Sequence, residues 1–154
     1  MLKLFVASLL LLGVGFETRP PCPAMCQCVY DGTVQDAVAH ASVVFVGRVV
    51  ASTDTLIDYG AGPGHGVPHS ILTFLVDERW KGPGTDSIRI LTPQASTACA
   101  AFFMPGPNLV FAHADTSGLF FTSSCDRNRS LKEARKDIRA LGRPVFRRSL
   151  GAFR

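Results

Sequence analysis

The fold is decided by the stretch Ser42-Val43-Val44-Phe45-Val46-Gly47-Arg48-Val49-Val50. Its valines and its phenylalanine are β-branched or aromatic residues, which favour strands. Apolar residues occupy consecutive positions at its start, so we expect both faces of this strand to be buried, as a barrel strand can be. Gly47 lies inside the apolar run and indicates a bulge or a sharp bend.

A second strand is expected at residues 71–80, where apolar and polar side chains alternate. The alternation assigns one face to Leu72, Phe74, Val76 and Trp80, and the other to Thr73, Asp77 and Arg79. A turn follows at residues 81–84, and three more strands are expected at residues 87–92, 108–114 and 119–122. Five short strands separated by turns predict an all-β domain, either a small barrel or a sandwich.

Two helices are expected, one before the strands and one after them. Thr33 with Asp36 three residues later has the pattern of a capping box and predicts a helix at residues 33–39. Ser130 and Glu133 repeat this pattern ahead of a second helix, which Gly142 and Pro144 end. The second helix has an apolar stripe at helical spacing, which we expect to pack on the strands: Leu131, Ala134, Ile138 and Leu141.

The composition fits one globular domain with a basic end. The chain has 154 residues, of which 47% are hydrophobic and 18% charged, and this excludes a disordered chain. Residues 1–125 carry six Lys or Arg against nine Asp or Glu, whereas residues 126–154 carry ten against three. Because positive charge does not spread over the body of the domain, a nucleic-acid-binding core is not expected.

The N-terminal sequence predicts an export signal. Lys3 precedes an apolar stretch at residues 4–14, a charge and length typical of a secretory signal peptide at residues 1–24. Cleavage after Ala24 satisfies the small-residue rule, while cleavage after Met25 would expose Cys26 as the first residue; the sequence leaves both open. We expect a secreted or periplasmic protein.

Cysteine usage agrees with export. The five cysteines are Cys22, Cys26, Cys28, Cys99 and Cys125, and cleavage would leave the last four. Four cysteines in an oxidising compartment predict two disulfides, with three possible pairings. Because residues two apart rarely bond to each other in an extended segment, each cysteine of the C-x-C pair is expected to bond to a distant partner. A zinc site is the alternative, although paired C-x₂-C knuckles are absent.

The sequence shows no catalytic motif, so we expect a binding protein without a cofactor rather than an enzyme. His65 and His69 are four residues apart around a Gly- and Pro-rich loop at residues 58–68, which favours a mobile loop over a metal site. His113 lies in an expected strand, as a packed or surface residue.

Basic residues follow the outer face of the second expected helix and continue beyond it: Lys132, Arg135, Lys136, Arg139, Arg143, Arg147, Arg148 and Arg154. Such a run is typical of a solvated helix face with a frayed tail. Attraction to an anionic polymer or a membrane surface is the alternative interpretation.

Several of these segments occur together in one known family. They are Cys26-Gln27-Cys28, residues 36–49, residues 74–82, Thr97-Ala98-Cys99 and residues 122–125. In this order they resemble the bacterial TIMP-like (tissue inhibitor of metalloproteinases) proteins of the netrin-module superfamily, over residues 26–142. The resemblance implies a five-stranded OB-like Greek-key barrel at residues 25–142, followed by a basic tail at residues 143–154. It also implies disulfides Cys26–Cys99 and Cys28–Cys125.

The same resemblance implies how the protein acts. In animal inhibitors of this family, the α-amino group and carbonyl oxygen of the first cysteine chelate the catalytic zinc of a protease. Here Cys26 would be that chelator and Gln27 would enter the specificity pocket. Cys28 and Val29 would line the cleft, with Thr97 and Ala98 beside them. The free protein would hold no metal. A non-inhibitory interaction module that binds an anionic partner or surface is the alternative function.

Overall fold

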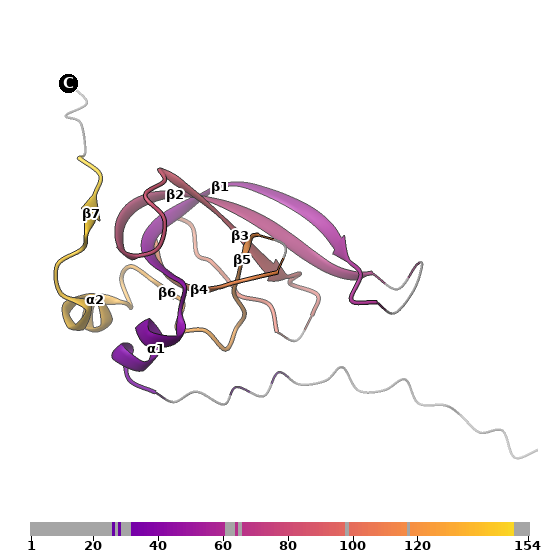
Figure 1. Cartoon of the computed structure of the whole chain (residues 1–154), viewed down its shortest axis with the longest axis horizontal. Coiled ribbons are helices and arrows are strands. Elements are labelled where there is room, and N and C mark those ends of the chain that lie inside the picture. Colours follow the sequence, from indigo (N-terminus) through magenta and orange to yellow (C-terminus); the bar gives the residue numbers. More distant parts are fainter. Residues whose placement is uncertain are drawn as a thin grey trace, which may run out of the picture.

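The structure is a computed structural model that describes residues 26, 28, 32–60, 64, 66–97, 99–116 and 118–149. Along the chain, the elements of this part are α1 (Val34–His40), β1 (Val43–Ile57), β2 (Val67–Lys81), β3 (Ser87–Pro93), β4 (Asn108–Ala114), β5 (Phe120–Phe121), β6 (Arg129–Ser130), α2 (Arg135–Leu141) and β7 (Phe146–Arg147) (Figure 1). The expected signal peptide at residues 1–24, Gln27, Val29, His65, Ala98 and residues 150–154 lie outside the described residues.

Five strands form a closed ring. The strand order is β1-β2-β3-β5-β4, and the antiparallel pairing of β1 with β4 closes it. β3 and β5 are parallel, whereas the other neighbours in the ring are antiparallel. The prediction of an all-β fold with five main strands and two short helices is therefore confirmed, and the two short strands β6 and β7 were not predicted.

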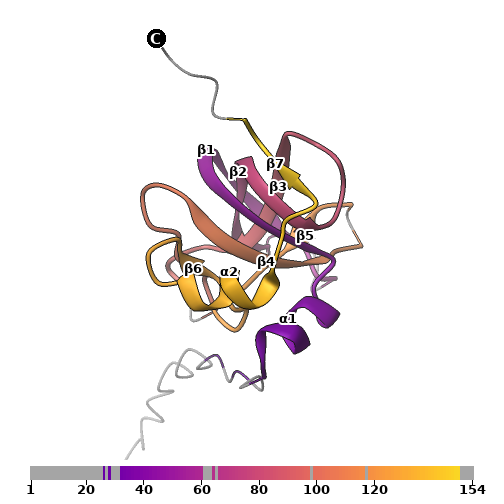
Figure 2. The ribbon, with the colours of Figure 1, turned by 90° about the vertical axis from the view of Figure 1, so that its left-hand side faces the viewer.

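The apolar residues make two cores, one on each face of β1. The first contains Phe45, Phe74 and Val110; the rings of Phe45 and Phe74 meet edge to face at 5.4 Å between centroids. The second includes Val44 and Phe111 and receives residues of both helices. Figure 2 shows α1 and α2 together on one side of the ring. Residues 43–46 are buried on both faces, as the run of apolar residues predicts.

Gly47 marks a bulge, as expected. The β1–β2 register shifts between Val46 and Gly47, and a Cβ at Gly47 would lie 2.6 Å from the carbonyl oxygen of Leu75. The shift changes which face of β2 points to which core. Trp80, predicted on the face of Phe74, instead packs against the helix-side core, and its Nε1 donates to the Gly142 carbonyl at 2.9 Å. That part of the alternation was wrong because the bulge reverses the phase.

The β1–β2 hairpin is longer than predicted. Both strands have 15 residues, and residues 51–57 pair regularly with residues 67–73. His69, predicted in a loop, lies in β2 with 2% of its surface exposed. Its Nε2 is 3.0 Å from the hydroxyl of Tyr59, and its Nδ1 is 2.9 Å from the carbonyl oxygen of Val67. The second half of β1 is mostly polar and exposed, and among the described residues it pairs with β2. It therefore lacks the alternation of apolar and polar residues that would have predicted a strand there.

α1 begins as predicted and α2 does not. At α1, the backbone N–H of Asp36 donates to Thr33 Oγ1 at 3.2 Å, and the N–H of Thr33 donates to Asp36 Oδ2 at 2.7 Å. Ser130 instead belongs to β6, and α2 starts at Arg135 without a side-chain cap. Its predicted stripe is also one residue shorter: Leu131 is 37% exposed, while Ala134, Ile138 and Leu141 pack on the ring.

The segment after α2 lies against β2. β7 pairs with residues 78–79 of β2, and Phe146 packs on the first core and under the guanidinium of Arg79, at 5.1 Å. Arg147 forms an ion pair with Glu78 at 2.8 Å. Arg79, predicted on the polar face, is thereby only 9% exposed. Within the described part of the chain, no helix has the length and hydrophobicity needed to cross a membrane.

Candidate functional site

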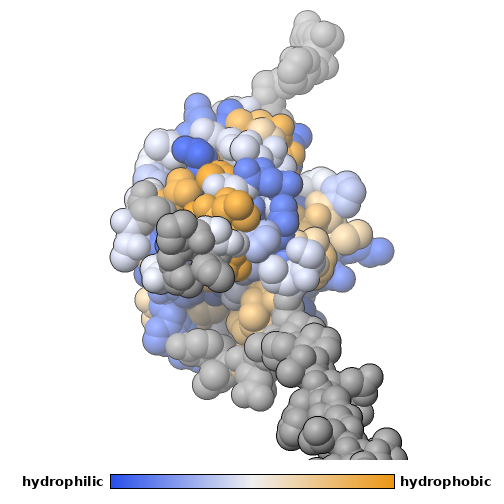
Figure 3. Space-filling model, turned by 90° about the vertical axis from the view of Figure 1, so that its right-hand side faces the viewer, coloured by the Kyte–Doolittle hydropathy of each residue, from blue (hydrophilic) through white to orange (hydrophobic). Residues whose placement is uncertain are grey.

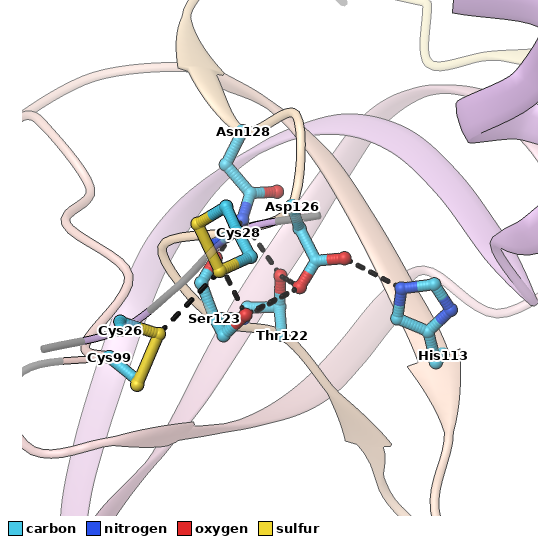
Figure 4. The surroundings of a disulfide bond; sticks show 9 residues. Cys26, Cys28, Cys99, His113, Thr122, Ser123, Asp126 and Asn128 are labelled. Atoms are coloured by element: carbon cyan, nitrogen blue, oxygen red, sulfur yellow. Dashed lines mark hydrogen bonds and ion pairs between the residues drawn. A yellow bond between two sulfur atoms is a disulfide. The ribbon is translucent and has the colours of Figure 1, made fainter. Parts of the chain in front are cut away.

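Two disulfides attach the C-x-C segment to the ring. Cys26 bonds to Cys99 and Cys28 to Cys125, with Cα–Cα distances of 5.1 and 5.0 Å. The prediction of two disulfides is confirmed, and the pairing is the one that the resemblance implies. The two bonds touch, because Cys26 Sγ lies 3.5 Å from Cys125 Sγ, and Figure 4 shows them side by side. The segment is thus fixed at two points only two residues apart.

The loops that carry Cys99 and Cys125 are also joined to each other through the backbone. The N–H of Ser124 donates to the Cys99 carbonyl oxygen at 3.0 Å. The N–H of Cys125 donates to Ser123 Oγ at 3.2 Å. The first bond joins the two loops and the second lies within the Cys125 turn, and neither involves a sulfur atom.

Asp126 organises the turn that carries Cys125. Its Oδ2 accepts a hydrogen bond from the N–H of Ser123 at 2.7 Å and lies 3.2 Å from the hydroxyls of Ser123 and Thr122. Its Oδ1 is 2.6 Å from Nε2 of His113, in β4 (Figure 4). The Asp126 side chain is 13% exposed. A carboxylate with this many donors ties the turn firmly to the ring.

Two further side chains, those of Asn128 and Arg127, brace this turn. The side chain of Asn128 accepts from the N–H of Phe111 at 2.9 Å and donates to Thr122 Oγ1 at 2.7 Å. Arg127 forms a two-point ion pair with Asp137 of α2, at 3.0 and 3.1 Å, and donates to the Gly32 carbonyl oxygen at 3.2 Å. The turn therefore connects β4, α2 and the residues just before α1.

A pocket of about 300 Å³ opens beside the Cys28–Cys125 disulfide. The residues around it include Thr33, Asp36, His40, His113, Arg127 and Arg129. The hydroxyl and backbone of Thr33 donate to Asp36 and lower the pKa of that carboxyl. The acids of this pocket, Asp36 and Asp126, accept hydrogen bonds that hold the neighbouring loops in place. This fits residues that support the C-x-C segment.

Of the predicted wedge residues, the structure describes Cys26, Cys28 and Thr97, and it brings the first two together. Cys26 is half-buried and Cys28 is exposed. Thr97, whose hydroxyl donates to the Gln94 carbonyl at 2.8 Å, lies in the loop that the first disulfide joins to Cys26. Gln27, Val29 and Ala98 lie outside the described residues, so their places stay predictions.

Sequence reasoning missed Asp126 and His113. Ser123 and Asp126 have the same three-residue spacing as Thr33 and Asp36, and this local pattern could have indicated the hydrogen bond from the Ser123 backbone. The pairing of Asp126 with His113 depends on how β4 lies against the turn, which no local pattern reports.

No family model matches the chain, and the search of curated proteins finds no match either.

Proposed function

We propose that this protein is an exported, disulfide-anchored module of the TIMP-like type, which inhibits a zinc metalloprotease through the backbone of Cys26. The observation that carries the proposal is the double attachment of the C-x-C segment. Two touching disulfides hold Cys26 and Cys28 at the surface of a closed ring of strands. A segment fixed in this way loses little conformational entropy when it binds.

The proposed chemistry needs only one residue. A catalytic zinc keeps an open coordination position for water or substrate. The α-amino nitrogen and carbonyl oxygen of an N-terminal Cys26 would bind the zinc as a five-membered chelate, which displaces the water and makes the zinc five-coordinate. The amine must be free, so the processed chain must begin at Cys26. Gln27 would then enter the pocket next to the zinc, with Cys28, Val29, Thr97 and Ala98 flanking it.

The test compares two proteins that differ by one residue. One begins at Cys26, and its matched control carries a single additional alanine before Cys26. Intact mass before and after reduction verifies each N-terminus and counts the disulfides. We expect the first protein to inhibit members of a zinc metalloprotease panel and the extended protein to lose inhibition, with identical circular dichroism. Inhibition that survives the extension would exclude the chelate, and no inhibition by either protein would remove the proposal.

A second function is favoured by the distribution of ion pairs. Lys132, Arg135 and Arg139 line a shallow hollow on α2 and the turn before it, together with Leu131 and Ile138. Among the described residues, these three basic side chains have no acidic partner within ion-pair distance. Arg147 and Arg148, by contrast, pair with Glu78 and Asp86. Binding to an anionic polymer or surface would therefore use α2 rather than the segment after it.

Charge-reversal variants test whether an anionic partner binds at α2 or at the segment after it. The triple variant Lys132→Glu, Arg135→Glu, Arg139→Glu is expected to lose salt-sensitive retention on an anionic matrix. The control is Arg147→Glu with Arg148→Glu, a charge reversal of the same kind at two arginines that are already paired, and it should keep more of the retention. Equal retention of the triple variant and the native protein would exclude the α2 face.

A further inference from the structure

We infer that the four cysteines form a zinc site when both disulfides are reduced. The sulfurs of Cys26, Cys28 and Cys125 all lie within 4.8 Å of one another, and that of Cys99 is bonded to Cys26. In a tetrahedral Zn–S₄ centre with Zn–S bonds of about 2.3 Å, neighbouring sulfurs are about 3.8 Å apart. Cys26 Sγ and Cys125 Sγ are already 3.5 Å apart. Cys99 is not one of these three, so completing the site requires its side chain to rotate toward Cys28 and Cys125 once its bond to Cys26 is broken.

Half of this site does not depend on the disulfides. The loops of Cys99 and Cys125 are joined by the hydrogen bond from the Ser124 N–H to the Cys99 carbonyl oxygen. Asp126 holds the Cys125 turn through Ser123 and His113. After reduction these contacts keep two thiols at the place where the C-x-C segment meets them (Figure 4). Zinc would then hold that segment as the disulfides do in the oxidised protein.

A metal ion can reach the cysteines from solvent, because Cys28 is exposed and Cys26 and Cys125 are half-buried. The adjoining pocket contains Arg127 and Arg129 but also Asp36 and Asp126, so the thiolates themselves, and not the surrounding charge, would attract the metal. Thiolate sulfur is also the ligand type that selects zinc over hard cations such as Mg²⁺.

A phosphine can reduce both disulfides to thiols. Each disulfide accepts two electrons from the phosphine, which takes an oxygen atom from one water molecule and becomes a phosphine oxide. The two hydrogens of that water yield two thiols. Zn²⁺ binding to the four thiols then releases four protons, so zinc affinity rises with pH.

The experiment uses protein that begins at Met25, which lacks Cys22, so that only the four cysteines of the site can bind. Oxidised and phosphine-reduced protein are titrated with Co²⁺ and then with Zn²⁺ alone. We expect one metal ion per reduced chain, the absorption of a tetrahedral cobalt–thiolate centre, its loss when Zn²⁺ displaces Co²⁺, and no such absorption from oxidised protein. Zn²⁺ should also raise the melting temperature of the reduced protein.

Two results would overturn the inference. Cys99→Ser removes one ligand and is expected to lower zinc affinity by more than about tenfold, since loss of a mere supporting contact already costs 10–100-fold. Equal affinity of this variant and its parent would exclude a four-cysteine site. Circular dichroism is the second readout: zinc-loaded reduced protein must have the β spectrum of the oxidised protein. Zinc bound to a chain without that spectrum would show binding to an unfolded state.

Discussion

Removing either disulfide should destabilise the fold by nearly the same amount, although the two loops differ in length. Cys26–Cys99 closes 73 residues and Cys28–Cys125 closes 97. Taken singly, these loops restrict the unfolded chain by about 4.4 and about 4.7 kcal/mol on the chain-entropy model. The two loops overlap, however, so the second disulfide closes a loop in a chain that the first disulfide already restricts.

The structure gives the size of the second contribution. With Cys26 joined to Cys99, the shortest path from Cys28 to Cys125 runs two residues back to Cys26, across the bond, and 26 residues forward from Cys99. Closing this path of about 28 residues is worth about 3.6 kcal/mol. The same short path applies when the other bond is present first. Each single removal should thus cost about 3.6 kcal/mol, and removal of both about 8 kcal/mol.

Urea unfolding of three paired variants measures these values. The variants are Cys26→Ala with Cys99→Ala, Cys28→Ala with Cys125→Ala, and all four together. We expect the two double variants to agree within about 0.5 kcal/mol and the quadruple variant to lose more than their sum. A quadruple loss equal to the sum, or double variants differing by about 2 kcal/mol or more, would refute the overlapping-loop reasoning.

Three smaller predictions concern single side chains. Thr33→Ala should cost about 1 kcal/mol in urea unfolding by removing the cap of α1. The contacts from Thr33 lower the pKa of Asp36, so the stabilisation that they provide is present above about pH 4 and is lost as the pH falls through the folded pKa. The stability of the Thr33→Ala variant, measured by unfolding, should therefore depend less on acid pH. Gly47→Ala should cost about 1–3 kcal/mol, since its Cβ would meet the Leu75 carbonyl oxygen, whereas Gly84→Ala, with no atom nearer than 3.9 Å, should be mild in the same assay. Partial burial of Tyr59, which is 64% exposed, and to a lesser extent Asp115, raise the pKa of its hydroxyl. The contribution to stability is therefore small, is present below about pH 10 and is lost as the pH rises through the folded value; Tyr59→Phe should lose slightly less stability in alkaline unfolding curves.

Features set by neighbouring residues could be predicted from the sequence. The Thr33–Asp36 capping box depends on atoms three residues apart, and it is present. The strand at residues 108–114 has the predicted bounds, because its apolar run is bounded by turn residues on both sides. Gly47 could be assigned to a bulge, because a glycine inside a β-branched run has few other reasons to occur.

Features set by register could not be predicted. The bulge at Gly47 reverses which way the last residues of β2 point, and this places Trp80 under the helices and Arg79 toward Phe146. Phe146 lies in a strand of two residues, too short to produce a periodic pattern. The burial of Arg79 therefore depends on a residue far along the chain that no local signal connects to it.

The candidate site also has some features that the sequence predicts and others that it does not. The cysteine count and the C-x-C spacing indicated two disulfides, because both are read directly from the sequence. The contact of the two bonds, and the Asp126–His113 pair that supports them, arise from the placement of loops around a closed ring. Sequence spacing carries no information about such distances.

The ring and the C-x-C segment differ in what holds them. Strand pairing fixes the ring, but neither Cys26 nor Cys28 belongs to a strand, and no backbone hydrogen bond joins either to other described residues. The described contacts that hold Cys26 and Cys28 are thus those of their sulfur atoms. If the proposed inhibition and the proposed zinc site both hold, inhibition by protein beginning at Cys26 should fall under a phosphine reductant and recover when one equivalent of Zn²⁺ is added. Recovery that also occurs with Cys99→Ser would separate inhibition from the four-cysteine site, and inhibition unaffected by reduction would show that the backbone alone holds the segment.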